Sequence, residues 1–329
     1  MKALVTGGGG FLGKAIVKLL LARGDQVRSF SRSTYPELVK LGVEHIRGEL
    51  DDAEAVLRAV EGCDIVFHVA AKAGVWGPYD EFYRANVLGT RTVIAASRQN
   101  GIRRLVHTSS PSVVFDGTDM EGVDESVPYP DHYEAFYPQT KAEAEQLVLQ
   151  ANDDTLATVA LRPHLIWGPE DNHLVPRILE RGARGELRRI GSRTCLVDTI
   201  YIDNAATAHL QAADQLEIGS AVAGKVYFLA QGEPLPVWEV VNRILAAGGL
   251  PPVRRTMSPG LAYAAGAVLE TTYRLLRLKG EPRMTRFVAR ELSTAHWFDL
   301  GAARRDFGYA PQVSFDEGIE RLRGWLAEP

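Results

Sequence analysis

Tyr137 and Lys141 stand four residues apart in the stretch Tyr-Pro-Gln-Thr-Lys. At that spacing two side chains lie on one face of a helix, so the phenol and the ammonium are expected to be neighbours. A free tyrosine has a pKa of about 10 and is a poor base at neutral pH, but a nearby positive charge favours the phenolate. The pair therefore predicts a tyrosine that donates a proton to a ketone oxygen or removes one from an alcohol.

Hydroxyl groups in Thr108-Ser109-Ser110 follow an apolar stretch that begins at Arg104 and is typical of a buried strand. Ligands of open parallel sheets bind beyond the carboxyl ends of the strands, so a serine here can hydrogen bond to the same substrate oxygen. We expect Ser110 in this role. Ser109 is the alternative, because the pattern defines the end of the strand only to within one residue.

The N-terminal stretch has the form strand, glycine turn, helix. Ala3-Leu-Val5 is apolar, four glycines follow Thr6, and apolar residues then recur at helical spacing. In this arrangement Gly7 allows a tight turn, Gly10 lets the backbone approach a phosphate, and Gly13 permits close packing of the helix on the strand. Because a helix N-terminus attracts anions, the turn predicts a site for the pyrophosphate of a dinucleotide.

The end of the second expected strand indicates which dinucleotide binds. A carboxylate about 20 residues after the glycines would bind a ribose 2′-hydroxyl, but Ser31, Arg32 and Ser33 stand there instead. An arginine between hydroxyls can hold a 2′-phosphate, so we predict NADP(H); a solvated surface arginine is the alternative. Glu49, at the end of the third strand, is a candidate to accept a hydrogen bond from the adenine amino group, with a surface acid as the alternative. We expect the neighbouring Leu50 to contact the cofactor as well.

The elements that position these residues alternate between strand and helix patterns over the first half of the chain. This alternation predicts an α/β protein with a Rossmann-type, doubly wound parallel sheet. We expect strands at 26–31, 43–47, 64–71, 104–110 and 157–162, and helices at 37–41, 52–60, 86–99 and 142–151. Beyond Pro163 the alternation breaks, which predicts an NADP-binding domain at 1–162 and an interleaved, smaller substrate domain at 163–329. Residues 196–215 are expected to return to the Rossmann core.

Composition and charge indicate which partners and which cellular location to expect. Of 329 residues, 46% are hydrophobic, and 37 Lys and Arg face 41 Asp and Glu without a basic block, which argues against nucleic acid as a partner. Cys63 and Cys195 are far apart and predict buried, reduced thiols; no metal-ligand pattern is present. No apolar run reaches the ~18 residues of a membrane span, and the chain starts directly on a strand, so we expect a cytoplasmic protein without a signal peptide.

Five motifs in order resemble the extended short-chain dehydrogenases/reductases. They are Thr6-Gly-x-x-Gly-x-x-Gly13, His68-x-Ala-Ala71, Asn86, Thr108-Ser-Ser110 and Tyr137-x-x-x-Lys141. Leu161-Arg-Pro163, Ile166-Trp-Gly-Pro169 and Arg305-Asp-Phe-Gly-Tyr-x-Pro311 are similar to the 3β-hydroxysteroid dehydrogenase-like branch. The resemblance implies a catalytic set of Ser110, Tyr137 and Lys141, with Asn86 shaping the active-site helix. It also implies that the cofactor contacts include Gly7, Gly10, Phe11, Leu12, Ala70, Ala71, Lys141 and the loop after Pro163.

Further stretches resemble the reductases of bacterial long-chain olefin biosynthesis, among them Ala71-Lys-Ala-Gly-x-Trp-Gly77, Gly232-Glu-Pro-Leu-Pro236 and His296-Trp297. The resemblance implies NADPH-dependent reduction of a 2-alkyl-3-oxoalkanoic acid, a β-keto acid with two long alkyl chains. The hydroxy acid would pass to a β-lactone-forming enzyme, and the family resemblance implies a homodimer and assembly with pathway enzymes. The alternatives are a sterol or hydroxysteroid dehydrogenase, a nucleotide-sugar epimerase, and a non-catalytic NADP(H) sensor.

The apolar segment Leu261–Leu278 has three interpretations. Glu270 is its only acid, and Arg274, Arg277 and Lys279 stand at its end. It is a core helix of the smaller domain, a lid over a long alkyl substrate, or a surface helix that contacts a membrane through its basic end.

Lys72 and Trp76, beyond the fourth strand, are candidates to face the substrate, with a surface lysine and a core tryptophan as the alternatives.

Overall fold

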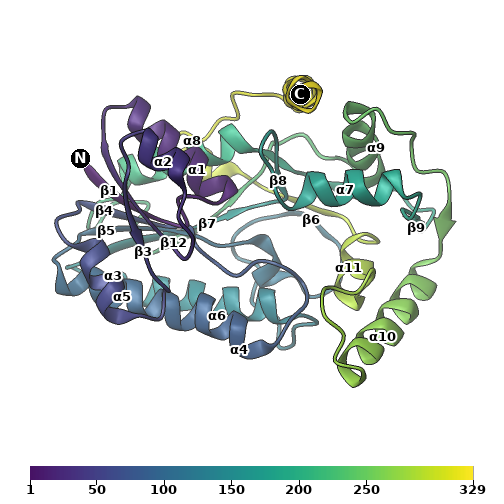
Figure 1. The fold of residues 1–329 in the computed structure, drawn as a ribbon, viewed down its shortest axis with the longest axis horizontal. Coiled ribbons are helices and arrows are strands. Elements are labelled where there is room, and N and C mark those ends of the chain that lie inside the picture. Colours follow the sequence, from purple (N-terminus) through teal and green to yellow (C-terminus); the bar gives the residue numbers. More distant parts are fainter. Residues whose placement is uncertain (329) are drawn as a thin grey trace.

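The computed structural model describes residues 1–328, and a seven-stranded sheet is its centre (Figure 1). The strand order is β12-β7-β5-β4-β1-β2-β3, and every neighbouring pair is parallel. The central strands β1, β4, β5 and β7 are buried almost throughout, which explains their continuous apolar sequences. The strands are β1 Lys2–Thr6, β2 Gln26–Ser31, β3 Glu44–Arg47, β4 Ile65–His68, β5 Arg104–Thr108, β7 Ala157–Pro163 and β12 Lys225–Leu229.

Helices cover both faces of this sheet, as a doubly wound fold requires (Figure 1). One face carries α1 Phe11–Ala22, α2 Pro36–Lys40 and α8 Ile202–Gln215, and α1 packs closely on α8. The other face carries α3 Ala53–Val60, α5 Gly89–Gln99 and α6 Phe136–Gln150. The short helix α4 Tyr79–Phe82 and the π-helical turn η1 Tyr83–Leu88 precede α5, and Asp52 caps α3 by accepting from the amide of Ala55.

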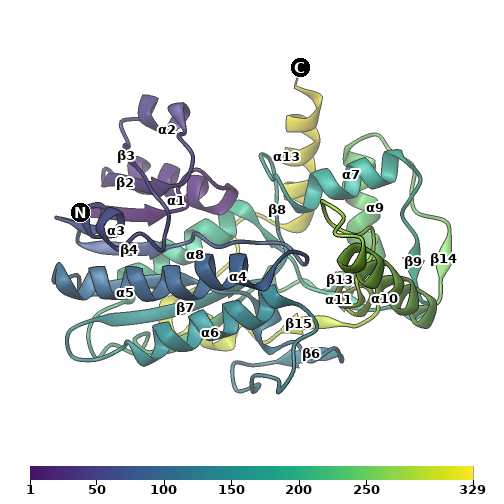
Figure 2. The ribbon, with the colours of Figure 1, turned by 60° about the horizontal axis from the view of Figure 1, so that its bottom comes forward.

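A smaller unit lies beyond the carboxyl ends of the strands (Figure 2). Its four-stranded sheet has the order β13-β10-β15-β6, and two short strand pairs, β8–β11 and β9–β14, join neighbouring loops. The strands are β6 Met120–Val123, β8 Ile166–Trp167, β9 Arg189–Ile190, β10 Leu196–Val197, β11 Ile200–Tyr201, β13 Leu235–Pro236, β14 Thr256–Met257 and β15 His296–Phe298. The helices of the second half are α7 Leu174–Ala183, α9 Val237–Ala247, α10 Pro259–Leu275, α11 Arg286–Glu291, α12 Gly301–Phe307 and α13 Phe315–Ala327.

The predicted fold class is confirmed, with corrections to individual elements. Residues 225–229, which the sequence placed with the smaller domain, form β12 at the edge of the main sheet, where they pair with β7. Conversely, β6 comes from the first half of the chain but pairs with β15 in the smaller sheet. Of the segment 196–215, helix α8 packs on the Rossmann core, whereas β10 belongs to the smaller sheet. The two units therefore interleave in both directions.

Helix α10 occupies the segment whose role the sequence left open. Only Ala262, Gly266 and Glu270 of its residues are buried, so the core-helix interpretation is wrong. No residue of α10 lines the main cavity described below, so it is not a substrate lid in this conformation either. Within residues 1–328 no helix is both long enough and apolar enough to cross a membrane.

Candidate active site

A cavity of about 920 Å³ lies at the carboxyl ends of β1, β2, β4, β5 and β7 and extends into the smaller unit. This is the position at which open parallel sheets bind ligands. One part of its wall comes from the glycine turn and the ends of β2 and β3. The other part comes from α7, α9 and α11. The cavity thus extends from the glycine turn to a region within the smaller unit.

The glycine turn is tightly packed and leaves the N-terminus of α1 without a side-chain cap. Gly7 has φ +69°, and a Cβ there would lie 2.9 Å from the Cα of Ala70, so a side chain is excluded by both conformation and space. A Cβ on Gly13 would lie 2.1 Å from the carbonyl oxygen of Gly7. Helix α1 has no side-chain cap and no acid in its first turn, so its backbone N–H groups stay available for an anion.

The end of β2 presents unpaired polar groups to the cavity. The Oγ of Ser31 is buried and has no hydrogen-bond partner within residues 1–328. Arg32 is exposed and lines the cavity, and no ion pair of its guanidinium is found among the described residues. Glu49 and Leu50 line the same region from the end of β3. The glycine turn and the polar residues at the end of β2 fit a nicotinamide dinucleotide.

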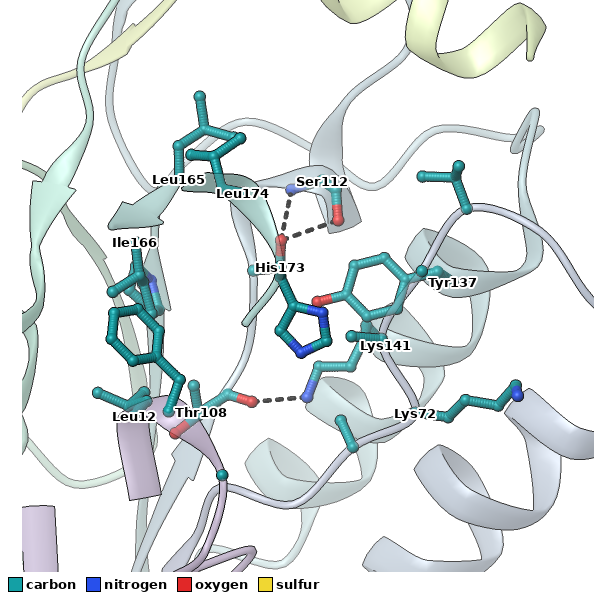
Figure 3. A pocket seen from close by; sticks show the side chains of 18 of the residues that line it. Leu12, Lys72, Thr108, Ser112, Tyr137, Lys141, Leu165, Ile166, His173 and Leu174 are labelled. Atoms are coloured by element: carbon teal, nitrogen blue, oxygen red, sulfur yellow. Dashed lines mark hydrogen bonds between the residues drawn. The ribbon is translucent and has the colours of Figure 1, made fainter. Parts of the chain in front are cut away.

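Helix α6 brings Tyr137 and Lys141 to the cavity wall beside β5 (Figure 3). The helix starts at Phe136, so Tyr137 and Lys141 lie on it as expected, and it tolerates Pro138 in its first turn, where no helical hydrogen bond from the proline nitrogen is needed. The Nζ of Lys141 donates to the carbonyl oxygen of Thr108 at 2.6 Å and lies 3.2 Å from the Nε2 of His107. Burial lowers the pKa of Lys141 to about 8.

Tyr137 is held as a neutral phenol. Burial raises its pKa, a hydrogen bond from Ser110 to the phenolate form opposes this shift, and the charge of Glu291 adds to it. Burial is the largest of these contributions to the pKa of Tyr137. A protonated phenol beside a buried cation is suited to giving a proton to a carbonyl oxygen.

Ser110 lies just after β5, where it caps the 3₁₀ turn η2 Pro111–Val114. Its Oγ accepts from the amide of Ser112 at 3.2 Å and is 2.9 Å from the Ser112 hydroxyl (Figure 3). Ser109, the alternative, also lines the cavity, and its buried Oγ has no partner among residues 1–328. Ser110 faces Tyr137 closely enough to act on the phenol, which favours it over Ser109.

Asn86 joins the loop after β4 to the catalytic helix. Its Oδ1 accepts from the amide of Lys72 at 2.7 Å, and its Nδ2 donates to the Oγ1 of Thr140 at 3.0 Å. Thr140 directly precedes Lys141, so Asn86 braces α6 against the loop that carries Ala70 and Ala71. Both alanines line the cavity, as does Pro163 at the end of β7.

The region of the cavity in the smaller unit is mainly apolar. Its lining comes from α7, α9, α11 and the residues that follow α7 and α11, and the apolar members include Ile178, Leu187, Val237, Trp238, Val241, Phe287, Val288 and Leu292. Arg177 and Arg181 of α7 add two cations to this wall. Lys72 lines the cavity, but its Nζ is paired with the carboxylate of Glu81 at 2.7 Å. Trp76 is not part of the wall and instead packs edge-on against Tyr273 of α10. This apolar lining suits a substrate with bulky hydrocarbon groups.

The structure adds site residues that no sequence motif indicated. His107 contacts Lys141, Ser112 orients Ser110, and His173 and Glu291 line the cavity from α7 and α11. Burial raises the pKa of Glu291 to about 7. The strand pattern around His107 shows that the residue belongs to the sheet but not which face of the sheet its side chain lies on. Glu291 is more than 150 residues from Tyr137, and no sequence pattern connects the two.

The model of the 3-beta hydroxysteroid dehydrogenase/isomerase family matches residues 4–258. The chain belongs to this family. The resemblance drawn from the motifs is thereby confirmed, and this 3β-hydroxysteroid dehydrogenase family member is an oxidoreductase of the extended short-chain type that uses a nicotinamide dinucleotide. The residues predicted above as catalytic and cofactor contacts all line one cavity.

Two relatives of this family member have the same name. The 2-alkyl-3-oxoalkanoate reductase of Stenotrophomonas maltophilia (strain K279a) is 56% identical over 325 residues, which cover 98% of each chain. That of Shewanella oneidensis is 52% identical and covers 98% of this chain and 86% of its own. A mouse sterol-4-alpha-carboxylate 3-dehydrogenase (decarboxylating) is 33% identical over 97% of this chain and 89% of its own.

A solved structure supports the fold. The UDP-glucose 4-epimerase of Thermus thermophilus, in complex with NAD, superposes with a TM-score of 0.75. It is 26% identical, and the match covers 99% of both chains. The dinucleotide-binding architecture is therefore shared with an enzyme whose substrate is a nucleotide sugar.

Proposed function

We propose that this protein is an NADPH-dependent reductase that converts a 2-alkyl-3-oxoalkanoic acid to the 2-alkyl-3-hydroxyalkanoic acid. The observation that carries the proposal is one cavity in which Tyr137 and Lys141 border a large apolar region. Two relatives that are 56% and 52% identical over nearly the whole chain are named for this reaction. An apolar wall accommodates two alkyl chains far better than it accommodates a sugar nucleotide.

The residues divide the chemistry between them. When bound, NADPH supplies the hydride that reduces the keto carbon. Ser110 donates a hydrogen bond to the keto oxygen and holds it against Tyr137, which gives that oxygen its proton. The raised pKa of Tyr137 keeps the phenol protonated for this step. Lys141 holds the cofactor ribose, and its ammonium favours the phenolate that remains, which is then reprotonated.

The choice of NADP(H) rests on the end of β2. Ser31 and Arg32 line the cavity where a ribose 2′-phosphate would lie, and Glu49 lines it nearby as the candidate contact to the adenine. A phosphate gains a charged, bidentate partner there, whereas a ribose hydroxyl gains much less. We therefore infer a preference for NADP(H) over NAD(H).

NADPH oxidation tests the reaction. We expect turnover with a 2-alkyl-3-oxo acid and little with a hydroxysteroid or sugar-nucleotide substrate. Tyr137→Phe should lower kcat by about 10²- to 10⁴-fold while NADPH affinity is retained, because only the proton donor is lost. Activity confined to sterols would favour the activity named for the mouse relative, activity confined to sugar nucleotides would overturn the proposal, and an undiminished rate in Tyr137→Phe would overturn the role of this residue.

Direct titration tests the cofactor preference. Arg32→Ala should weaken NADPH binding by about tenfold or more and leave NADH binding nearly unchanged, since a charge-assisted bond to phosphate contributes about 1.5–3 kcal/mol. Arg58→Ala is the matched control, because Arg58 is an exposed arginine on α3 that does not line the cavity. An equal loss of affinity for both cofactors in Arg32→Ala would contradict the assignment.

Homodimer formation, association with a β-lactone-forming enzyme, and a cytoplasmic location stay predictions.

A further inference from the structure

Helix α10 and the three residues after it carry half of the exposed large hydrophobic side chains among the described residues. Ten such side chains are exposed within residues 1–328, and five of them lie in the short segment 261–278. They are Leu261, Val268, Leu275, Leu276 and Leu278. Three of them are spaced by seven residues, which aligns them along one side of a helix. Val268 is 65% exposed and Leu275 77% exposed, so this row faces solvent.

The opposite side of α10 is fixed to the protein. A Cβ on Gly266 would lie 2.6 Å from the backbone carbon of Thr285, so the helix packs directly on the start of α11. The buried Glu270 accepts from the backbone and guanidinium of Arg286 at 2.7 Å and 2.9 Å. Figure 1 shows α10 at the edge of the molecule, away from the main sheet. The apolar row is therefore held outward and is not a loosely packed part of the core.

Basic residues flank this row at both ends. Residues 251–279 contain five basic side chains, Arg254, Arg255, Arg274, Arg277 and Lys279, and a single acid, the buried Glu270. Among the described residues Arg254, Arg255, Arg277 and Lys279 have no ion-pair partner, although the whole chain carries a net charge of −4. An apolar stripe bordered by uncompensated cations has the chemistry of a surface that binds anionic lipid headgroups.

The same helix adjoins the substrate cavity. Trp76 packs edge-on against Tyr273, with ring centroids 6.2 Å apart, and lies under the guanidinium of Arg274 at 5.4 Å. Ala73, Gly74 and Val75, which directly precede this tryptophan, line the cavity. A surface that rests on α10 would therefore lie beside one wall of the cavity.

We propose that the outer face of α10, with its basic ends, binds the surface of an anionic phospholipid bilayer. Leu261, Val268 and Leu275 enter the boundary between headgroups and acyl chains, and Arg277 and Lys279 contact the anionic headgroups. The chain lies on the bilayer and does not cross it. Building on the proposed function, this arrangement places the wall formed by residues 73–75 of the cavity beside the bilayer in which a long-chain substrate dissolves.

Sedimentation with vesicles tests the proposal without any substrate, so its outcome is independent of reductase activity. We expect the full chain to bind vesicles of phosphatidylcholine with phosphatidylglycerol, to bind phosphatidylcholine alone much more weakly, and to dissociate as salt is added. Val268→Ser/Leu275→Ser and, separately, Arg277→Glu/Lys279→Glu should each reduce binding by about tenfold or more. Neither pair lines the cavity, so NADPH affinity and thermal stability should stay at the wild-type level and report correct folding.

Val39→Ser/Leu41→Ser is the matched control, because these side chains are 52% and 50% exposed on another face and should leave vesicle binding unchanged. Wild-type protein that stays in the supernatant with anionic vesicles would overturn the proposal. So would binding that is equal for both vesicle types and for all variants. A dimer that Val268→Ser/Leu275→Ser dissociates, seen by sedimentation velocity without vesicles, would assign this face to a second copy of the chain instead.

Discussion

Lys141 occupies a buried polar pocket that the Tyr-Lys motif alone does not describe. Its ammonium donates to a backbone carbonyl and lies 3.2 Å from the Nε2 of His107. Burial and the charge of Lys141 keep the pKa of His107 well below its usual value, so the imidazole is neutral and accepts from the ammonium. His68, on the neighbouring strand, lies against this ring at 5.2 Å between centroids. His107 is thus a positioning residue for the catalytic lysine.

Removing this acceptor should move the pH profile of the reductase. Lys141 carries its charge below a pKa of about 8, so we expect kcat for reduction to fall as pH rises through that value. His107→Leu removes a charge-assisted hydrogen bond to Lys141, so the fall in kcat should move to lower pH by about one unit. His107→Gln keeps an acceptor and should restore much of the profile. Identical profiles for both variants and the wild type would show that His107 has no influence on Lys141.

Glu291 should oppose ionisation of the catalytic phenol. Burial raises its pKa to about 7, and above that pH its negative charge raises the pKa of Tyr137. Oxidation of the hydroxy acid needs the phenolate, so its rate should rise with pH. Glu291→Gln removes the charge, lowers the pKa of Tyr137, and should move that rise to lower pH by roughly half a unit. Glu143→Gln, on the catalytic helix, is the control; an unmoved midpoint in Glu291→Gln would contradict the prediction.

At the scale of elements, α6 is attached to the sheet by a buried ion pair. Glu145, one turn beyond Lys141, accepts from the Nε and Nη2 of Arg162 on β7 at 2.9 Å and 2.6 Å, and both side chains are almost fully buried. Tyr129 donates a further hydrogen bond to the same carboxylate. The charge of Glu145 also raises the pKa of Lys141, against the effect of burial. One carboxylate therefore positions the helix and supports the charge of the catalytic lysine.

Breaking this pair on one side should be costly. Arg162→Met leaves a buried carboxylate without its cation, and we expect the free energy of unfolding to fall by about 3–5 kcal/mol. Glu145→Leu/Arg162→Met removes both charges and should recover most of this loss. Urea unfolding followed by tryptophan fluorescence measures both variants. A double variant as unstable as the single one would show that packing, and not the unpaired charge, causes the loss.

Elements that a local sequence pattern defines were predictable, and elements that depend on pairing between distant segments were not. Continuous apolar runs and the glycine turn encode β1, β4, β5, β7 and the start of α1 locally, and all of these were predicted, although β4 ends at His68 and β5 at Thr108, three and two residues earlier than predicted. The place of β12 in the main sheet depends on its pairing with β7, more than 60 residues earlier, and no local pattern contains that pairing. His107 and Glu291 join the site through tertiary contact alone. Tyr137 and Lys141 were predictable because four residues on one helix suffice to place them together.

On the scale of the whole molecule, the segment 165–173 connects the smaller unit to the cofactor side of the cavity. Glu170, in this segment, pairs with Lys14 at 2.7 Å and Lys18 at 2.9 Å, both on α1. Residues 163–166 on one side and Asp171 and His173 on the other line the cavity. The two ion pairs thus attach this part of the cavity wall to the helix whose N-terminus is proposed to hold the pyrophosphate.

This attachment should affect cofactor release more than stability. Exposed ion pairs contribute about 0–1 kcal/mol each, so Glu170→Gln should change the free energy of unfolding by less than about 1 kcal/mol. The freed segment should open more often, and NADPH should dissociate about fivefold faster, the equivalent of about 1 kcal/mol. Stopped-flow measurement of NADPH fluorescence gives this rate. Glu180→Gln is the matched control, because Glu180 forms an exposed ion pair with Arg184 at the end of α7 and does not bridge the two units. Equal dissociation rates in the two variants would show that the contacts with α1 do not restrain the segment.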